Sequence, residues 1–134
     1  MAMMELTMGN WIRVLSVAGL LLLAACAVAP VYDQQTTPHE APPGATLEQV
    51  TEAIKQAGLS LGWRMAEKEP GRIIGTLRVR SHEAVVEVLY DTERYSITYL
   101  NSVNLKYDGQ RIHKNYNSWV QNLSNAIYAQ VSSI

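Results

Sequence analysis

Three stretches rich in Val, Ile, Tyr and Thr, at residues 72–80, 83–90 and 94–100, constrain the fold of this chain most strongly. Short breaks separate them, the first at Ser81-His82, as expected of strands joined by hairpin turns. Aligned through these turns, the stretches sort into one almost wholly apolar face and one mixed face, and a shift of one residue would destroy the sorting. On the apolar face Leu77 would pair with Val86 and Val86 with Tyr99. The sequence therefore predicts an antiparallel meander.

Helical patterns flank these strands on both sides. Thr46 and Gln49 fit a capping box, in which each side chain bonds a free backbone N–H, at the start of a helix over 47–60. Beyond the strands, apolar residues recur at helical spacing and predict a second helix over 111–131.

A fourth strand near 63–68 completes the domain, because the Pro70-Gly71 pair that follows suits a type II turn. Both helices can then cover the apolar face of the sheet. The expected fold is α+β and two-layered: a four-stranded antiparallel meander sheet flanked by an N-terminal and a C-terminal helix (α-β-β-β-β-α). Trp63 and Trp119 are expected to be largely buried.

The N-terminus has the layout of a secretion signal. Residues 14–25 form an uncharged run of 12 after Arg13, too short for a membrane-spanning helix, which needs about 20 apolar residues. The run ends in Leu23, Ala24, Ala25 and Cys26, which resembles the lipobox of bacterial lipoproteins. By that resemblance residues 1–25 are a signal peptide and Cys26, the only cysteine, is the lipidated residue, its thiolate being the nucleophile.

The segment after Cys26 has the composition of a tether. Residues 26–45 contain four prolines and few apolar residues, which predicts a disordered, partly polyproline II segment. The folded domain, a periplasmic one, would then span 46–134. Because Ala27 rather than Asp follows Cys26, the resemblance to sorted lipoproteins of Gram-negative bacteria favours the outer membrane over the inner membrane.

Charge and motifs exclude several classes of function. Residues 26–134 hold 10 basic and 11 acidic residues, so the sequence indicates neither a nucleic-acid surface nor a polybasic patch for anionic lipids. His39, His82 and His113 each lack a second ligand at metal-binding spacing. No nucleophile elbow, zinc-protease helix or glycine-rich phosphate loop occurs. We expect no metal, no cofactor and no catalytic residue, and therefore a protein that is not an enzyme.

Two groups of residues are candidates for binding. The first is a polar corner, where amides and phenols could bind a sugar or a peptide backbone, unless they only satisfy backbone groups of an irregular connection. Its residues are Asn101, Ser102, Asn104, Tyr107, His113, Tyr116 and Asn117. The second is the mixed sheet face, which a partner could contact, unless it is a solvated face on which Arg78 and Glu87 lie diagonally across strands. Its residues are Ile74, Arg78, Arg80, Val85, Glu87, Leu89 and Leu100.

Much of the chain resembles a group of small, uncharacterised proteobacterial lipoproteins. The resemblance covers most of 50–131 and rests on Gly62-Trp63, Pro70-Gly71, Arg80-Ser81-His82, Tyr95-Ser96-Ile97, Tyr99, Ser102, Asn104-Leu105, Tyr107, Ile112-His113 and Tyr116-Asn117-Ser118-Trp119. It implies an envelope location and a compact α/β domain, and it carries no catalytic residue. We expect a non-enzymatic binding or scaffolding module of the cell envelope, held to the membrane by the lipid on Cys26, with an envelope protein as partner. The alternative is a glycan- or peptide-binding or enzymatic site at the polar corner.

Overall fold

The computed structural model describes residues 27–134. The predicted signal peptide over 1–25, with the lipobox-like residues Leu23, Ala24 and Ala25, and the predicted lipidation site Cys26 lie outside the described residues. Within residues 27–134 the structure has two helices and seven strands, in the order β1 (Val28–Pro30), β2 (Gln34–Pro38), α2 (Leu47–Ser60), β3 (Arg64–Glu69), β4 (Arg72–Val79), β5 (His82–Tyr90), β6 (Arg94–Val103), β7 (Arg111–His113) and α3 (Lys114–Ser132).

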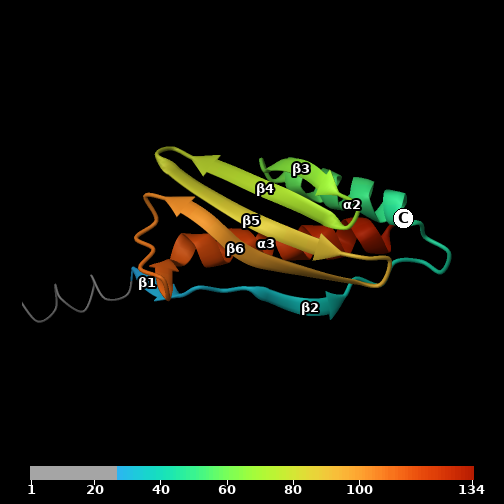
Figure 1. The fold of residues 1–134 in the computed structure, drawn as a ribbon, viewed down its shortest axis with the longest axis horizontal. Coiled ribbons are helices and arrows are strands. Elements are labelled where there is room, and N and C mark those ends of the chain that lie inside the picture. The colour runs from blue at the N-terminus through green and yellow to red at the C-terminus, as the bar shows by residue number, and fades with distance from the viewer. Residues whose placement is uncertain (1–26) are drawn as a thin grey trace, which may run out of the picture.

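The main sheet has five antiparallel strands in the order β2-β6-β5-β4-β3, and β1 and β7 form a separate two-stranded sheet. Both helices lie on the same face of the main sheet (Figure 1). This confirms the α+β class and the meander β3–β6. The predicted sheet of four strands is incomplete, because β2 adds a fifth strand at the outer edge of β6.

The register between β5 and β6 is right from Val86 to Tyr90, but a bulge shifts it at Val85, which pairs with Asn101 rather than Leu100; the register between β4 and β5 is displaced. Val86 pairs with Tyr99 as predicted, but Leu77 pairs with Ala84 rather than Val86. The hairpin turn lies one residue earlier than expected, since Val79 pairs with His82. Because the displacement is by two residues, every side chain keeps its predicted face.

The expectation of a disordered tether over 26–45 is wrong, since β1 and β2 both lie in it. His39, just after β2, is fully buried: its Nε2 lies 2.9 Å from the carbonyl oxygen of Asp91, and its Nδ1 accepts the N–H of Ala41 at 3.2 Å. The main-chain N–H of His39 also donates to the carbonyl of Glu93 at 3.1 Å. The folded domain therefore begins near Ala27 rather than at Thr46.

The first helix has the predicted bounds and its capping box, with Thr46 Oγ1 accepting from the N–H of Gln49 at 3.2 Å and Gln49 Oε1 from that of Thr46 at 2.9 Å. The second begins at Lys114 rather than at 111. The helical pattern extended too far because Ile112 is buried like the helix residues, although it lies in β7 and pairs with Ala29.

The core lies between the sheet and the helices and joins Val50, Ile54, Ile73, Val86, Val88, Ile97, Val120, Leu123 and Ile127 among others. Trp63 belongs to it, with 2% of its surface exposed, as predicted. Trp119 is only half-buried at the margin of the core, so its predicted burial is wrong in degree. Among residues 27–134, neither helix combines the length and the apolar character needed to cross a membrane.

Candidate functional site

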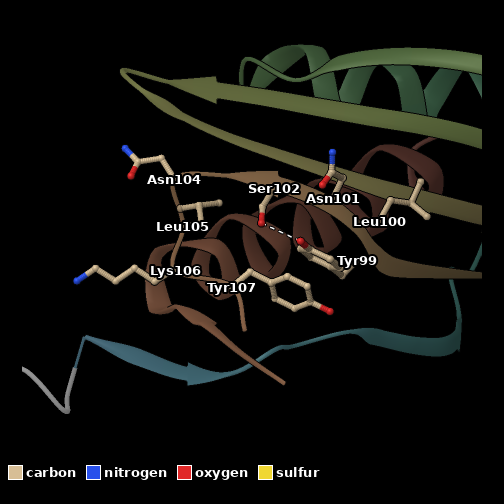
Figure 2. A pocket seen from close by; sticks show the side chains of 8 residues that line it. All are labelled: Tyr99, Leu100, Asn101, Ser102, Asn104, Leu105, Lys106 and Tyr107. Atoms are coloured by element: carbon tan, nitrogen blue, oxygen red, sulfur yellow. Dashed lines mark hydrogen bonds between the residues drawn. The ribbon is translucent and has the colours of Figure 1, made fainter. Parts of the chain in front are cut away.

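The polar corner contains a hollow of about 510 Å³ beside the second half of β6. Within the described chain, β2 pairs with β6 only as far as Ile97, so the strand beyond that point has no neighbour on this side. The hollow is lined by Tyr99, Leu100, Asn101, Ser102, Asn104, Leu105, Lys106 and Tyr107 (Figure 2). Four of the seven predicted corner residues are in this lining, and His113, Tyr116 and Asn117 are not.

Two tyrosine rings form an aromatic wall of the hollow. The ring centres of Tyr99 and Tyr107 are 4.2 Å apart, and Figure 2 shows the two rings side by side, with Lys106 pointing away. The hydroxyl of Tyr99 lies 2.8 Å from that of Ser102, and burial raises the pKa of Tyr99. Tyr107 is 43% exposed, so its ring is open to a ligand.

Asn104 is a structural residue of the turn that it occupies. Its Nδ2 donates to the hydroxyl of Ser81 at 2.8 Å, and His82 Nδ1 lies 2.6 Å from its carbonyl oxygen. Its φ of 57° is in the left-handed region that Asn tolerates better than most residues. Asn104 therefore ties the β4–β5 hairpin to the end of β6.

His113 and Asn117 are structural as well. His113 is the N-cap of α3, and its Nδ1 accepts the N–H of Asn115 at 3.2 Å. The Asn117 amide bonds both sides of the β1–β2 connection: Oδ1 accepts the N–H of Tyr32 and Nδ2 donates to the carbonyl of Pro30, each at 2.9 Å. These two side chains satisfy backbone groups, which is the alternative that the sequence left open for the corner.

Tyr116 lies fully buried behind the aromatic wall, with its ring edge-on to that of Tyr99 and the ring centres 5.6 Å apart. Its hydroxyl is buried and has no hydrogen-bond partner within residues 27–134. Burial, reinforced by the charge of Asp33, raises its pKa far above that of a free tyrosine. Full burial therefore removes Tyr116 from the predicted polar corner, because a ligand in the hollow cannot reach its hydroxyl.

The mixed sheet face is open, because both helices cover the opposite face. Leu89 and Leu100 are exposed by 44% and 45%, and Ile74 and Val85 are half-buried beside them. Arg80 is not part of this face, since it lies in the turn between β4 and β5.

The charges on this face pair differently from the diagonal pair that the sequence suggested. Arg78 Nε donates to Glu83 Oε2 at 2.6 Å, directly across the strands. Glu87 accepts instead from Arg72 Nε at 2.7 Å. The Arg78 side chain remains 76% exposed, so its other N–H groups face solvent.

Sequence reasoning missed three lining residues of the hollow, Tyr99, Leu105 and Lys106, and assigned a fourth, Leu100, to the mixed sheet face. Leu105 is 2% exposed and Lys106 has a φ of 56°, and neither property has a signature in this stretch. In residues 27–134 no group of three or more His, Cys, Asp or Glu side chains is placed to hold a metal ion. Compared with family models, curated proteins and solved structures, the chain matches none.

Proposed function

We propose that this chain is a non-enzymatic binding or scaffolding lipoprotein of the bacterial cell envelope, which takes a partner protein on the open face of its sheet. The lipobox-like residues Leu23–Cys26 support anchoring through lipid on Cys26, and Ala27 after that cysteine supports the outer membrane, on its periplasmic side. The resemblance to small proteobacterial lipoproteins agrees with both.

The observation that carries the binding proposal is the open sheet face with its exposed leucines. In the described part of the chain, a five-stranded sheet buries one face under two helices and has no covering layer on the other. Leu89 and Leu100 expose nearly half of their surface there, on neighbouring strands. Exposed apolar residues set among charges are the composition of non-obligate protein interfaces.

The paired charges of this face favour a protein over a lipid as the partner. Arg72 with Glu87, and Arg78 with Glu83, give the face both signs of charge in a fixed pattern. Such a pattern selects a complementary protein surface, because like charges placed opposite each other are penalised. The exposed N–H groups of Arg78 can donate to a carboxylate of that partner.

Site-specific photo-cross-linking in cells tests the proposal. A cross-linking residue at Leu89 or Leu100 should capture one defined envelope protein. The same residue at Leu59, which is 64% exposed on α2 on the other side of the molecule, is the matched control. Leu89→Asp with Leu100→Asp should abolish capture from a reporter at Val85 while leaving the circular dichroism spectrum unchanged. Equal capture from Leu59, or capture that survives the double substitution, would refute the sheet face as the interface.

The anchor is tested separately by labelling cells with radioactive palmitate. The label should enter the wild-type chain and be absent from Cys26→Ser, since the thiol is the lipid acceptor. Incorporation that survives Cys26→Ser contradicts the anchor. Fractionation to the inner membrane contradicts only the sorting to the outer membrane.

The hollow at the polar corner supports a second candidate function, the binding of a glycan or a peptide. The observation in its favour is the exposed ring of Tyr107, which lines a hollow that the amide of Asn101 also lines, since aromatic rings and amides are groups that sugars and peptides bind. Tyr107→Ala with Asn101→Ala should abolish saturable shifts of a soluble cell-wall fragment in NMR titrations. His113 and Asn117 are unsuitable for this test, because both hold the fold together.

A further inference from the structure

Four basic residues that are scattered in the sequence come together at one end of the molecule. They are Arg80, Lys106, Arg111 and Lys114, and all four are exposed. In Figure 1 this end holds the β4–β5 turn, the β6–β7 connection, the sheet of β1 and β7, and the start of α3. We call these four residues the basic end.

Hydrogen bonds connect the segments of the basic end to the first described residues of the chain. The N–H of Lys114 donates to the carbonyl of Ala27, and Arg111 Nη2 to that of Val28, each at 3.2 Å. The N–H of His113 donates to the carbonyl of Leu105 at 2.8 Å, next to Lys106. Ala27, the residue that follows Cys26 in the sequence, therefore lies at the basic end.

The charges of the basic end are only partly neutralised by nearby carboxylates. Within residues 27–134 none of its four side chains forms an ion pair. The nearby carboxylate of Asp108 accepts the N–H groups of Gln110 and Arg111, at 3.0 and 2.7 Å.

Two further carboxylates near this end are also engaged. Glu83 is bonded by Arg78, and Asp33 accepts the N–H of Tyr99 at 2.9 Å. With Asp33 and Asp108 counted against the four basic residues, the end keeps an excess of two positive charges.

The other end of the molecule carries acidic residues. The β5–β6 turn and the β2–α2 connection lie there (Figure 1), and they contain Asp91, Glu93 and Glu40. A chain that is nearly neutral as a whole is thus charged asymmetrically along its length. The count of basic and acidic residues could not reveal this, because the fold brings together positions as far apart as 80 and 114.

We propose that the basic end rests on the anionic phospholipid headgroups of the membrane that holds the anchor. The inference rests on the proposed anchor at Cys26 and is independent of the partner on the sheet face. Cys26 directly precedes Ala27, whose carbonyl accepts the N–H of Lys114. A lipid on Cys26 would therefore hold the basic end close to the headgroups. Lysine and arginine near an anionic surface are attracted to it, over about a Debye length.

Two exposed side chains add to this contact. Tyr107, next to Lys106 in the sequence, is 43% exposed. Val103, the last residue of β6, is 51% exposed. Tyrosine is favoured where an apolar ring meets a wet interface. In this orientation the strands of the main sheet run away from the membrane, and the open sheet face is accessible from the side.

Lysine acetylation on vesicles tests the orientation. The chain from Cys26 onward is coupled through its single thiol to a maleimide lipid, so the attachment does not depend on lipidation in cells. The four lysines divide evenly, with Lys106 and Lys114 at the basic end and Lys55 and Lys68 elsewhere. On vesicles with 30% phosphatidylglycerol, a water-soluble acetylating reagent should modify the first pair at least about fivefold more slowly than on phosphatidylcholine, the factor that one basic residue contributes. The rates of the second pair should not change.

Charge reversal supplies the matched comparison. Arg80→Glu with Arg111→Glu should remove the protection of Lys106 and Lys114, and 0.5 M salt should do the same. Arg64→Glu with Arg94→Glu changes the net charge equally at exposed sites off the basic end and should leave the protection intact.

Equal rates on both kinds of vesicle, or equal slowing of all four lysines, would overturn the orientation. Failure of palmitate to label Cys26 in cells would overturn the anchor instead. The two results are read from different experiments.

Discussion

Two buried tyrosines should respond in opposite ways to the loss of their hydroxyl groups. The Tyr116 hydroxyl is buried with no hydrogen-bond partner in the described part of the chain. The Tyr95 hydroxyl lies 2.6 Å from that of Ser124, in a side chain that is 3% exposed. Burial raises the pKa of both, so each hydroxyl is neutral at physiological pH and acts only through hydrogen bonding.

The expected magnitudes follow from these contacts. An unpartnered buried hydroxyl costs about 1–3 kcal/mol, so Tyr116→Phe should leave the free energy of unfolding unchanged or raise it. Tyr95→Phe removes a hydrogen bond and should lower the free energy of unfolding by about 1 kcal/mol. For a domain of about this size, 1 kcal/mol corresponds to roughly 4–8 °C in Tm, so the two variants should be clearly separated.

Urea unfolding of residues 27–134, followed by tryptophan fluorescence and checked by thermal melts, measures the difference. Tyr128→Phe is the control, because that side chain is 41% exposed and its bond to Glu40 is accessible to water. If Tyr116→Phe costs as much as Tyr95→Phe, the Tyr116 hydroxyl has a partner in solution and the argument fails.

Three further predictions concern stability. Trp63→Ala should lower the free energy of unfolding by about 3–5 kcal/mol, and Trp119→Ala should lower it clearly less, because Trp119 is only half-buried. Equal losses in urea melts would contradict this difference in burial. The fragment 46–134 should be less stable than 27–134 by at least about 2–6 kcal/mol, because it loses the ladders of β1 and β2 and at least four other hydrogen bonds at about 0.5–1.5 kcal/mol each; a fragment with an unchanged Tm would show that β1 and β2 contribute nothing. The pKa of Asp91 is lowered by the N–H groups of Glu93 and Arg94, so its carboxylate stabilises the fold above the pKa of unfolded aspartate, and this contribution is lost as pH falls through the lower folded pKa. Melts between about pH 2 and 5 should therefore depend less on pH in Asp91→Asn, and an identical pH dependence would contradict this contribution.

The sequence was informative where one local rule decided the structure. Thr46 and Gln49 marked the start of α2, because a capping box is a local hydrogen-bond pattern. The two faces of the meander were predictable because alternation is a property of each strand alone. The exact partner of Leu77 was not, since a displacement by two residues leaves the pattern unchanged and only the turn at Arg80 and Ser81 fixes it.

The sequence failed where pairing between distant segments decided the structure. Strand β2 is QQTTP, a polar edge strand with a bulge and a terminal proline, and it has no alternation to detect. At the polar corner the sequence named four of the residues that line the hollow, but it did not show that His113 and Asn117 bond backbone groups instead. Asn117 bonds Pro30 and Tyr32, more than 80 positions away, and such a contact leaves no periodic signal.

The pairing of β1 also bears on how the proposed lipoprotein precursor would mature. Val28 pairs with His113, so β1 cannot close until nearly the whole chain is available, and contacts between such distant segments form late in folding. For a secreted precursor, this delay leaves the residues beside Cys26 extended while the rest of the domain is still emerging. A processing enzyme that needs an extended substrate would then act before β1 closes. Under the proposed anchoring at Cys26, late closure of β1 would let cleavage and lipidation precede the completion of the domain.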